Sequence, residues 1–392
     1  MEQLQPILGL PQYDIISIHA SGGEVTIQAR YRGPVSCAEC GSIRLRNKGR
    51  ISRRVRHVSF AASRVWLELA GHRWQCRDCG VQFRQRFPGI LKGQQASEAF
   101  RRKVFEDHWD GINRSRVARR EGISPATVER HCEHFLKRLA AERSGAPCPR
   151  ILGIDEHFFS RKQGYATTFC DLKHHSVYDV VLGRSETALE GYLRKLQGKN
   201  EVQVVCMDLS SIYRAIVRQY LPKARIVADR FHVIRLINQH FLACWKEIDP
   251  VGAKNRGLLS LMRRHRHNLK PEQAVKLARY FAKYPAMEAI YRFKQRLCYL
   301  LLKKHKTRKQ CRKLAPRLLR AIAALQQSGL AALVTLGNTL YSWRDEIATM
   351  WRFTKNNGIT EGFHTKMEAL QRQAYGFRNF ENYRLRVKVL CS

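Results

Sequence analysis

Acidic side chains are scarce in this sequence. The 392 residues include 32 Asp and Glu against 71 Lys and Arg, which leaves a formal net charge of +39. The excess extends over the whole chain and is too large for an ordinary solvated basic face, so it predicts a polyanionic partner such as nucleic acid. Each phosphate that the protein neutralises releases counterions, and binding should therefore weaken steeply as the salt concentration rises.

Long apolar runs are also missing. No run approaches the roughly 20 residues that a membrane-spanning helix requires, and the first ten residues lack the basic start and apolar core of a secretory signal. We therefore expect a cytoplasmic protein. The 12 cysteines are unevenly spaced, which favours reduced thiols or a metal site over disulfides. The length predicts a multidomain protein with domains of about 100 to 200 residues.

Four of the cysteines form two pairs. Cys37-Ala-Glu-Cys40 and Cys76-Arg-Asp-Cys79 are each followed by glycine, and the segment between them is strand-like and rich in arginine. Both sulfurs of a CxxC pair can bind one ion, and two pairs complete a closed tetrahedral site of the kind that binds structural zinc. The alternative is four unrelated core cysteines. We predict a zinc ribbon domain over residues 1–92, with all four cysteines as metal ligands.

Residues 93–145 are predicted to form a helix-turn-helix domain. Gly122 can adopt a left-handed turn conformation, Ser124 can cap the following helix, and Pro125 suits its first position. The second helix of such a motif lies in the major groove of DNA. An ordinary helical hairpin would use the same capping residues. The predicted DNA contacts are basic or polar residues: Arg114, Arg116, Arg119, Arg120, Thr127 and Arg130.

Beyond a Pro- and Gly-rich linker at 144–149, the sequence changes to an α/β pattern. The predicted strands are 150–155, 165–172, 176–182, 202–208 and 225–229. Three antiparallel strands followed by alternating helix and strand is the order expected of an RNase H-like sheet. The first strand ends at Asp155 and the fourth at Asp208. Ligands collect at strand ends in open α/β sheets, so the two aspartates together are candidate catalytic residues, although either alone could be a plain cap.

A basic helical segment, residues 241–345, then interrupts this pattern. It is either an insertion that embraces DNA or a set of solvated helical faces. After it, Asn357-Gly358 predicts a turn, and Glu361 falls in the first turn of a helix, where the helix dipole favours an anion. That helix could place Glu361 against the two aspartates, while a glutamate near a cap can also be purely structural. The predicted sheet domain therefore has two parts, 150–240 and 346–392.

Together these motifs resemble those of ISL3-type insertion-sequence transposases. The matching elements are Gly153-Ile154-Asp155, Met207-Asp208 through Tyr213, Ala228-Asp229 through His232, Asn357-Gly358 through Gly362, and Tyr375 through Arg386. The resemblance implies a DDE transposase in which Asp155, Asp208 and Glu361 form the catalytic triad. It also implies an RNase H-like core split by an all-helical insertion. Asp229 and His232 match a further family motif with a structural or auxiliary role, and His364 stands where many members have asparagine.

The implied activity is cleavage and strand transfer at the terminal inverted repeats of an insertion sequence. Two Mg²⁺ or Mn²⁺ ions held by the triad would support in-line phosphoryl transfer. Such hard cations prefer carboxylates to thiolates, so magnesium and zinc would occupy separate sites. The expected partners are double-stranded DNA, from transposon ends and target, and a second copy of the chain in a dimer or larger assembly. The protein would be nucleoid-associated in a bacterial cytoplasm.

Two other functions fit part of these observations. A site-specific DNA-binding regulator of transposase origin needs the cysteine pairs, the helix-turn-helix and the positive charge, but no cleavage activity. A nuclease that cuts DNA without joining it needs the triad as well. Products of strand transfer distinguish both from a transposase.

Overall fold

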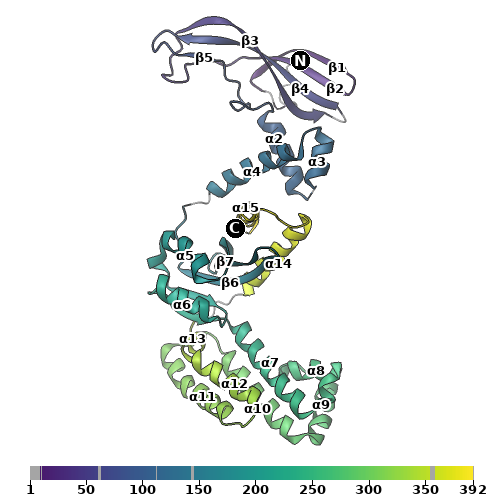
Figure 1. Ribbon diagram of the computed structural model, residues 1–392, viewed down its shortest axis with the longest axis vertical. Helices are drawn as coiled ribbons and strands as arrows, with labels where there is room; N and C mark the ends of the chain where they lie inside the picture. Colours follow the sequence, from purple (N-terminus) through teal and green to yellow (C-terminus); the bar gives the residue numbers. More distant parts are fainter. Residues whose placement is uncertain are drawn as a thin grey trace. The chain divides into compact units, whose positions relative to one another are not determined.

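The computed structural model describes residues 9, 11–60, 63–111, 113–142, 145–353 and 358–391. It divides the chain into two compact units, Met1–Leu139 and Ala140–Ser392, and each is considered by itself (Figure 1). The division falls near the end of a long helix, a few residues before the linker predicted at 144–149. The predicted turn at Asn357 lies outside the described residues.

The first unit begins with a sheet. Its strands are β1 (Tyr13–Ser21), β2 (Glu24–Tyr31), β3 (Leu45–Phe60), β4 (Ser63–Cys76) and β5 (Gln82–Arg84). The order is β1-β2-β4-β3, with β5 paired to β4, and only the β2–β4 pairing is parallel. Successive side chains of a strand point to opposite faces. Val65, Leu67 and Leu69 therefore face one side together, and all three are buried in the core of this sheet.

Three helices follow the sheet in the first unit: α2 (Glu98–Trp109), α3 (Arg114–Glu121) and α4 (Pro125–Ala141). Gly122 has the left-handed conformation predicted for it, with φ 66°, and ends α3. The Ser124 hydroxyl accepts a hydrogen bond from the Thr127 amide at 3.1 Å and so caps α4. The sequence signals for the turn between these two helices are confirmed.

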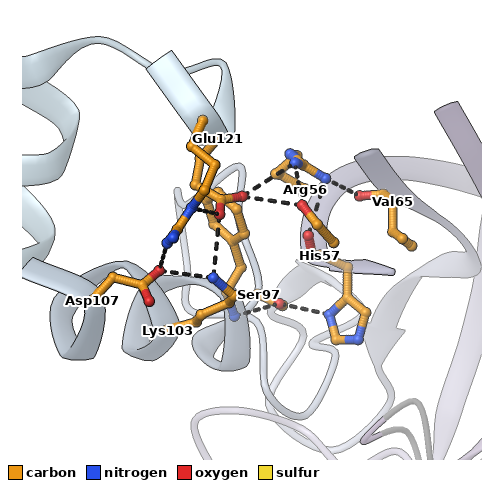
Figure 2. A network of polar contacts seen from close by, with 10 residues as sticks. Arg56, His57, Val65, Ser97, Lys103, Asp107 and Glu121 are labelled. Carbon is orange, nitrogen blue, oxygen red and sulfur yellow. Dashed lines mark hydrogen bonds and ion pairs between the residues drawn. The ribbon is translucent and has the colours of Figure 1, made fainter. Parts of the chain in front are cut away.

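A buried polar network joins β3 to the helices (Figure 2). Arg56 on β3 lies 3.6 Å from the Glu121 carboxylate on α3, and the two side chains are only 5% and 3% exposed. Lys103 on α2 donates to the same carboxylate at 3.2 Å and to Asp107 at 2.7 Å. Ser59 donates to Glu121 at 3.0 Å. Glu121 is therefore the shared anion that holds the sheet and the helices of this unit together.

The second unit contains a mixed five-stranded sheet. Its strands are β6 (Ile151–Ser160), β7 (Gly164–Asp171), β8 (Ser176–Leu182), β9 (Val204–Met207) and β10 (Arg225–Ala228). The order is β10-β9-β6-β7-β8. The hairpins β6–β7 and β7–β8 are antiparallel, whereas β9 is parallel to both β6 and β10. The sequence predicted these five strands in this succession along the chain, and the structure adds their order in the sheet.

Helices cover both faces of this sheet. They are α5 (Glu186–Lys195), α6 (Ser211–Tyr220), α14 (Gly358–Gln373) and α15 (Phe380–Leu390). Leu152 and Met207 pack in one core with residues of α5 and α6. Cys170 and Cys206 pack in a second core with residues of α14 and α15. Because Cys206 and Met207 are neighbours, the alternation of side chains along β9 assigns each to a different layer.

The chain between β10 and α14 is helical. Its helices are α7 (Arg230–Ile248), α8 (Arg256–Arg263), α9 (Pro271–Lys283), α10 (Pro285–Leu301), α11 (Arg308–Gln326), α12 (Ala331–Ser342) and α13 (Arg344–Thr349). Two short 3-10 turns, η2 (Gly252–Lys254) and η3 (Arg266–Asn268), lie between them. The helix α7 begins directly after β10, earlier than the predicted start at residue 241. Residues of α10 to α13 share the core of the sheet's α5–α6 face. No helix in the described ranges could span a membrane.

Replacing Glu121 by alanine should destabilise the first unit by about 3 kcal/mol, because Arg56 and Lys103 would lose the anion they share in a buried setting. Hydrogen–deuterium exchange of peptides from β3 and α3 measures the effect in the full chain. Glu129→Ala is the control, since Glu129 pairs with Arg114 on the exposed surface and its loss should cost less than about 1 kcal/mol. Equal protection in the two variants would contradict a structural role for Glu121.

Candidate functional site

The four paired cysteines lie together in the first unit. All four Sγ atoms are within 4.8 Å of one another. The two shortest contacts between the pairs are 3.5 Å, from Cys37 to Cys79 and from Cys40 to Cys76. Pairing of Leu45 with Cys76 across β3 and β4 brings the two pairs to the same end of the sheet. Among the described residues, this is the one group of three or more His, Cys, Asp or Glu with ligand atoms so close.

Backbone geometry favours the thiolate in one cysteine of each pair, Cys37 and Cys76, while the pKa of Cys40 and of Cys79 is raised beside the neighbouring thiols. Hydrogen bonds from backbone amides lower the pKa of Cys76 to about 6, with the amide of Cys79 as the largest cause, and the amide of Cys40 likewise lowers the pKa of Cys37. The thiolate is the form that binds metal. Gly41 and Gly80 both have φ 74°, which lets each chain turn sharply around its pair. Four sulfur donors in two knuckles fit tetrahedral Zn²⁺, as predicted.

The strand register of the second unit aligns three aspartates. Ile154 on β6 pairs with Met207 on β9, and Met207 pairs with Ala228 on β10. The next residue in each strand direction is an aspartate: Asp155, Asp208 and Asp229. Since the strands are parallel, all three residues lie side by side at the sheet edge where β9 and β10 end. The prediction that the first strand ends at Asp155 is wrong, because β6 stays paired with β7 as far as Ser160. The β9 residue is in the middle, so Asp208 has a carboxylate neighbour on each side.

Burial and mutual repulsion both act on these carboxyls. Burial is the main cause that raises the pKa of Asp155 to about 7, and the charges of Asp208 and Asp229 raise it further. The pKa of Asp208 is also raised, again mainly by burial. One oxygen of Asp208, Oδ1, is buried and accepts no hydrogen bond from the described residues. Ionising these neighbouring carboxyls is costly without a counter-charge, and one oxygen of Asp208 has no hydrogen-bond partner in the part of the chain that the structure describes. A hard divalent cation would supply both the charge and the partner.

Glu361 lies in the first turn of α14 and is exposed. Its helix packs on the sheet through Phe363 and Met367. One turn after Glu361, His364 approaches Asp155, with 3.9 Å between Nδ1 and the carboxylate oxygen. The helix therefore lies over the face of β6 that carries Asp155. Within the described ranges, however, the carboxylates of Asp155, Asp208 and Glu361 do not come within 4.8 Å of one another as a group.

A hydrogen-bonded chain fixes α14 and α15 against the strand that carries Asp155. His364 Nε2 lies 3.2 Å from the Thr168 hydroxyl, which is 3.0 Å from Nδ1 of His157. The other nitrogen of His157 lies 2.9 Å from the Tyr383 hydroxyl of α15. Thr168 is also the cross-strand partner of Asp155. Sequence reasoning identified none of this chain's members as a site residue except His364, because the contacts join segments far apart in the sequence.

The auxiliary pair predicted from the resemblance is at the same sheet edge. Asp229 is almost fully buried and precedes α7, and Nε2 of His232 lies 3.7 Å from its carboxylate. The charge of His232 lowers the pKa of Asp208, against the larger effect of burial. His232 therefore places a side chain that can carry positive charge beside the aspartates.

Some of the predicted DNA-contacting residues of the first unit already form ion pairs within the chain, and others are exposed. Arg116 and Arg119 are exposed on α3. Arg130 on α4 donates to the Thr127 hydroxyl at 3.0 Å. By contrast, Arg120 pairs with Asp107 and Glu121 in the buried network, and Arg114 pairs with Glu129 at 2.5 Å. A DNA contact by either of these two arginines would compete with an existing ion pair. All six contacts stay predictions.

Replacing Cys76 by serine should abolish zinc binding, because three sulfurs do not complete the closed site. Metal analysis of the purified full chain should find one zinc per native chain and almost none in the variant. Cys311→Ser, a change in the second unit, is the control and should retain the metal. Full zinc content in the Cys76 variant would contradict the site.

Replacing Asp155 by asparagine should stabilise the metal-free second unit at about pH 8. The carboxyl pKa is about 7 in the folded chain and 3.8 ordinarily. The unfolded state thus binds fewer protons between these values, and stability falls as pH rises through that window. The gain, at most about 4 kcal/mol, should vanish towards pH 4.

Denaturant unfolding in EDTA at several pH values tests this prediction. Asp171→Asn is a control of opposite sign: burial raises the pKa of Asp171, but hydrogen bonds from His174 outweigh it and the net shift is downward. That variant should lose stability at about pH 8. An Asp155 variant no more stable than the native chain would show that its carboxylate is not strained.

Two family models and one known transposase match this chain. A family model described as a transposase matches residues 152–387, and a model described as the zinc-finger of the transposases IS204, IS1001, IS1096 and IS1165 matches residues 33–79. The transposase for insertion sequence element IS1001 of Bordetella parapertussis is 23% identical over an alignment of 368 residues, which covers 90% of this chain and 88% of that protein. The first model matches more than half of the chain, and the chain belongs to the ISL3 family of transposases.

Proposed function

We propose that this transposase binds the terminal inverted repeats of its own insertion sequence and catalyses metal-dependent cleavage and transfer of DNA strands. The observation that carries the proposal is the register of β6 and β9, which places Asp155 and Asp208 side by side on neighbouring strands. The helix that carries Glu361 packs over the same strands. The relative from Bordetella parapertussis is itself named as the transposase of an insertion sequence.

In this proposal the second unit is an RNase H-like core interrupted by a helical insertion. The core consists of residues 150–240 and 346–392, and the insertion of residues 241–345. The mixed sheet, with three antiparallel strands followed by two parallel ones, and the helices on both of its faces support this interpretation. The chain leaves the sheet after β10 and returns to it at α14, and α10 to α13 in between contribute residues to the core on the α5–α6 face.

Asp155, Asp208 and Glu361 are the residues that would hold Mg²⁺ or Mn²⁺. A pair of such ions activates the attacking water or 3′-hydroxyl and stabilises the leaving oxygen of an in-line displacement. The chain's own contribution is to place the carboxylates and to shield them. Burial of the two aspartates makes their unneutralised charges costly, which favours cation binding. Glu361 completes the set from the exposed first turn of α14, where its side chain has room to move.

The first unit would supply DNA recognition. Its turn between α3 and α4 has the capping expected of a helix-turn-helix, whose second helix reads the major groove. Arg116, Arg119, Thr127 and Arg130 are the accessible candidates for contacts with double-stranded DNA. Bringing two transposon ends together requires at least two copies of the chain, so we propose a dimer or larger assembly on DNA.

The decisive test is an excision and integration assay on a marker flanked by the DNA segments that border this gene. Glu361→Gln should reduce Mg²⁺-dependent joined products by at least about 100-fold, because a metal ligand is lost, while DNA binding stays close to native. Glu368→Gln, two turns along the same helix, is the control: Glu368 forms an exposed ion pair with Arg372, and its replacement should leave joining intact.

The possible outcomes separate the remaining functions. Cleavage without joined products by the native chain would indicate a nuclease. Binding of the terminal repeats without cleavage by either chain would indicate a regulator. Equal joining by the native chain and Glu361→Gln would contradict the assigned triad.

A further inference from the structure

One face of the sheet near the zinc-binding cysteines carries a row of arginines. Arg73 on β4 lies directly opposite Arg84 on β5, and Gln75 lies opposite Gln82. Arg46 on β3 lies opposite Gln75 from the other side. Residues that pair across strands, and alternate residues along a strand, project from the same face. The pairings therefore place Arg46, Arg73 and Arg84 on one face, which we call the arginine row.

The arginine row has no counter-charge in the structure. All three side chains are exposed, and none forms an ion pair with any residue in the described ranges. Two other arginines of this unit do have carboxylate partners: Arg32 pairs with Asp14 and Arg54 with Glu24. Like charges directly opposite each other destabilise a sheet. The Arg73–Arg84 pair is therefore a cost to folding that a bound anion would remove.

The opposite face of the same strands is occupied by aromatic residues. Trp74 lies opposite Phe83, and both are partly buried. The His72 ring lies beside that of Trp74 in a tilted arrangement, with 5.3 Å between the ring centroids. The arginine row thus lacks the aromatic platform on which single-stranded bases stack. What remains is guanidinium groups and amides, which suit phosphate oxygens of a duplex backbone.

The zinc centre holds this surface in place. Gln75 immediately precedes the zinc-binding Cys76, and the amide of Cys76 donates to Val81, next to β5, at 2.9 Å. The short strand β5 is therefore tied to β4 by the cysteine loop. Metal binding and the position of Arg84 are coupled through this short segment.

We propose that the arginine row binds the phosphate backbone of double-stranded DNA, as a second contact of the first unit beside its helices. The inference rests on the proposed DNA binding of this transposase and adds a surface to it. Its contacts are to phosphate, so they contribute affinity and position rather than sequence specificity.

The salt dependence of binding to a fluorescein-labelled duplex tests the proposal, with the full zinc-loaded chain and a duplex of unrelated sequence. Arg73→Gln/Arg84→Gln should reduce the magnitude of the log–log salt slope by about 1.8, since each phosphate contact contributes about 0.9. Affinity at low salt should fall about 10-fold. Arg46→Gln alone, which leaves β5 unchanged, should reduce the slope by about 0.9.

Arg32→Gln/Arg54→Gln is the matched control, because it removes the same charge from arginines that already have carboxylate partners. Its slope should stay within about 0.5 of native. The melting temperature of Arg73→Gln/Arg84→Gln should equal or exceed that of the native chain, since a repulsive pair is lost.

The proposal would be overturned if Arg73→Gln/Arg84→Gln and Arg46→Gln both had the same salt slope as the native chain. It would also be overturned if Arg32→Gln/Arg54→Gln reduced the slope as much as Arg73→Gln/Arg84→Gln. A loss confined to single-stranded DNA would also overturn it. If the native chain itself bound no duplex, the proposed DNA binding would fail, and this result is distinct from an unaltered slope in the variants.

Discussion

The second unit depends on one constraint, the parallel register of β9 with β6 and β10. Hydrogen bonding aligns Ile154, Met207 and Ala228, so the aspartate after each residue arrives at the same sheet edge. A shift of a single residue would turn the side chains of β9 to the opposite face. Cys206 and Met207 belong to different cores, and this division holds the register in place. Packing of apolar residues thereby determines where the acidic residues meet.

Placing like charges together destabilises the folded state, and other contacts of the second unit must offset this. Burial opposes ionisation of both Asp155 and Asp208. The two helical layers and the chain of contacts from His364 to Tyr383 hold the strand in position despite this repulsion. The first unit shows the opposite case, because the buried carboxylate of Glu121 is stabilised by several cationic side chains. In both units, the position of a buried charged side chain is fixed by residues from several different strands and helices.

Local sequence signals predicted much of this architecture. The cysteine spacing predicted the zinc ribbon, and apolar runs predicted the five strands of the second unit in their succession along the chain. The structure added what depends on pairing between distant segments. Contacts between His157 and Tyr383 join residues separated by more than half of the chain, and no local pattern announces them. The sequence shows that the segment between the cysteine pairs is rich in arginine. Only the strand register shows that Arg73 of this segment lies opposite Arg84, which follows the second pair.

The central claim is that Asp155, Asp208 and Glu361 bind one metal centre. The most direct measurement is a crystal structure of the chain with Mn²⁺ and a duplex transposon end, with the manganese located by anomalous scattering. This account predicts manganese in contact with all three carboxylates. Manganese bound by Asp208 and Asp229, with Glu361 remote from it, would contradict the account. The metal ligands would then include Asp229, which follows β10, in place of Glu361.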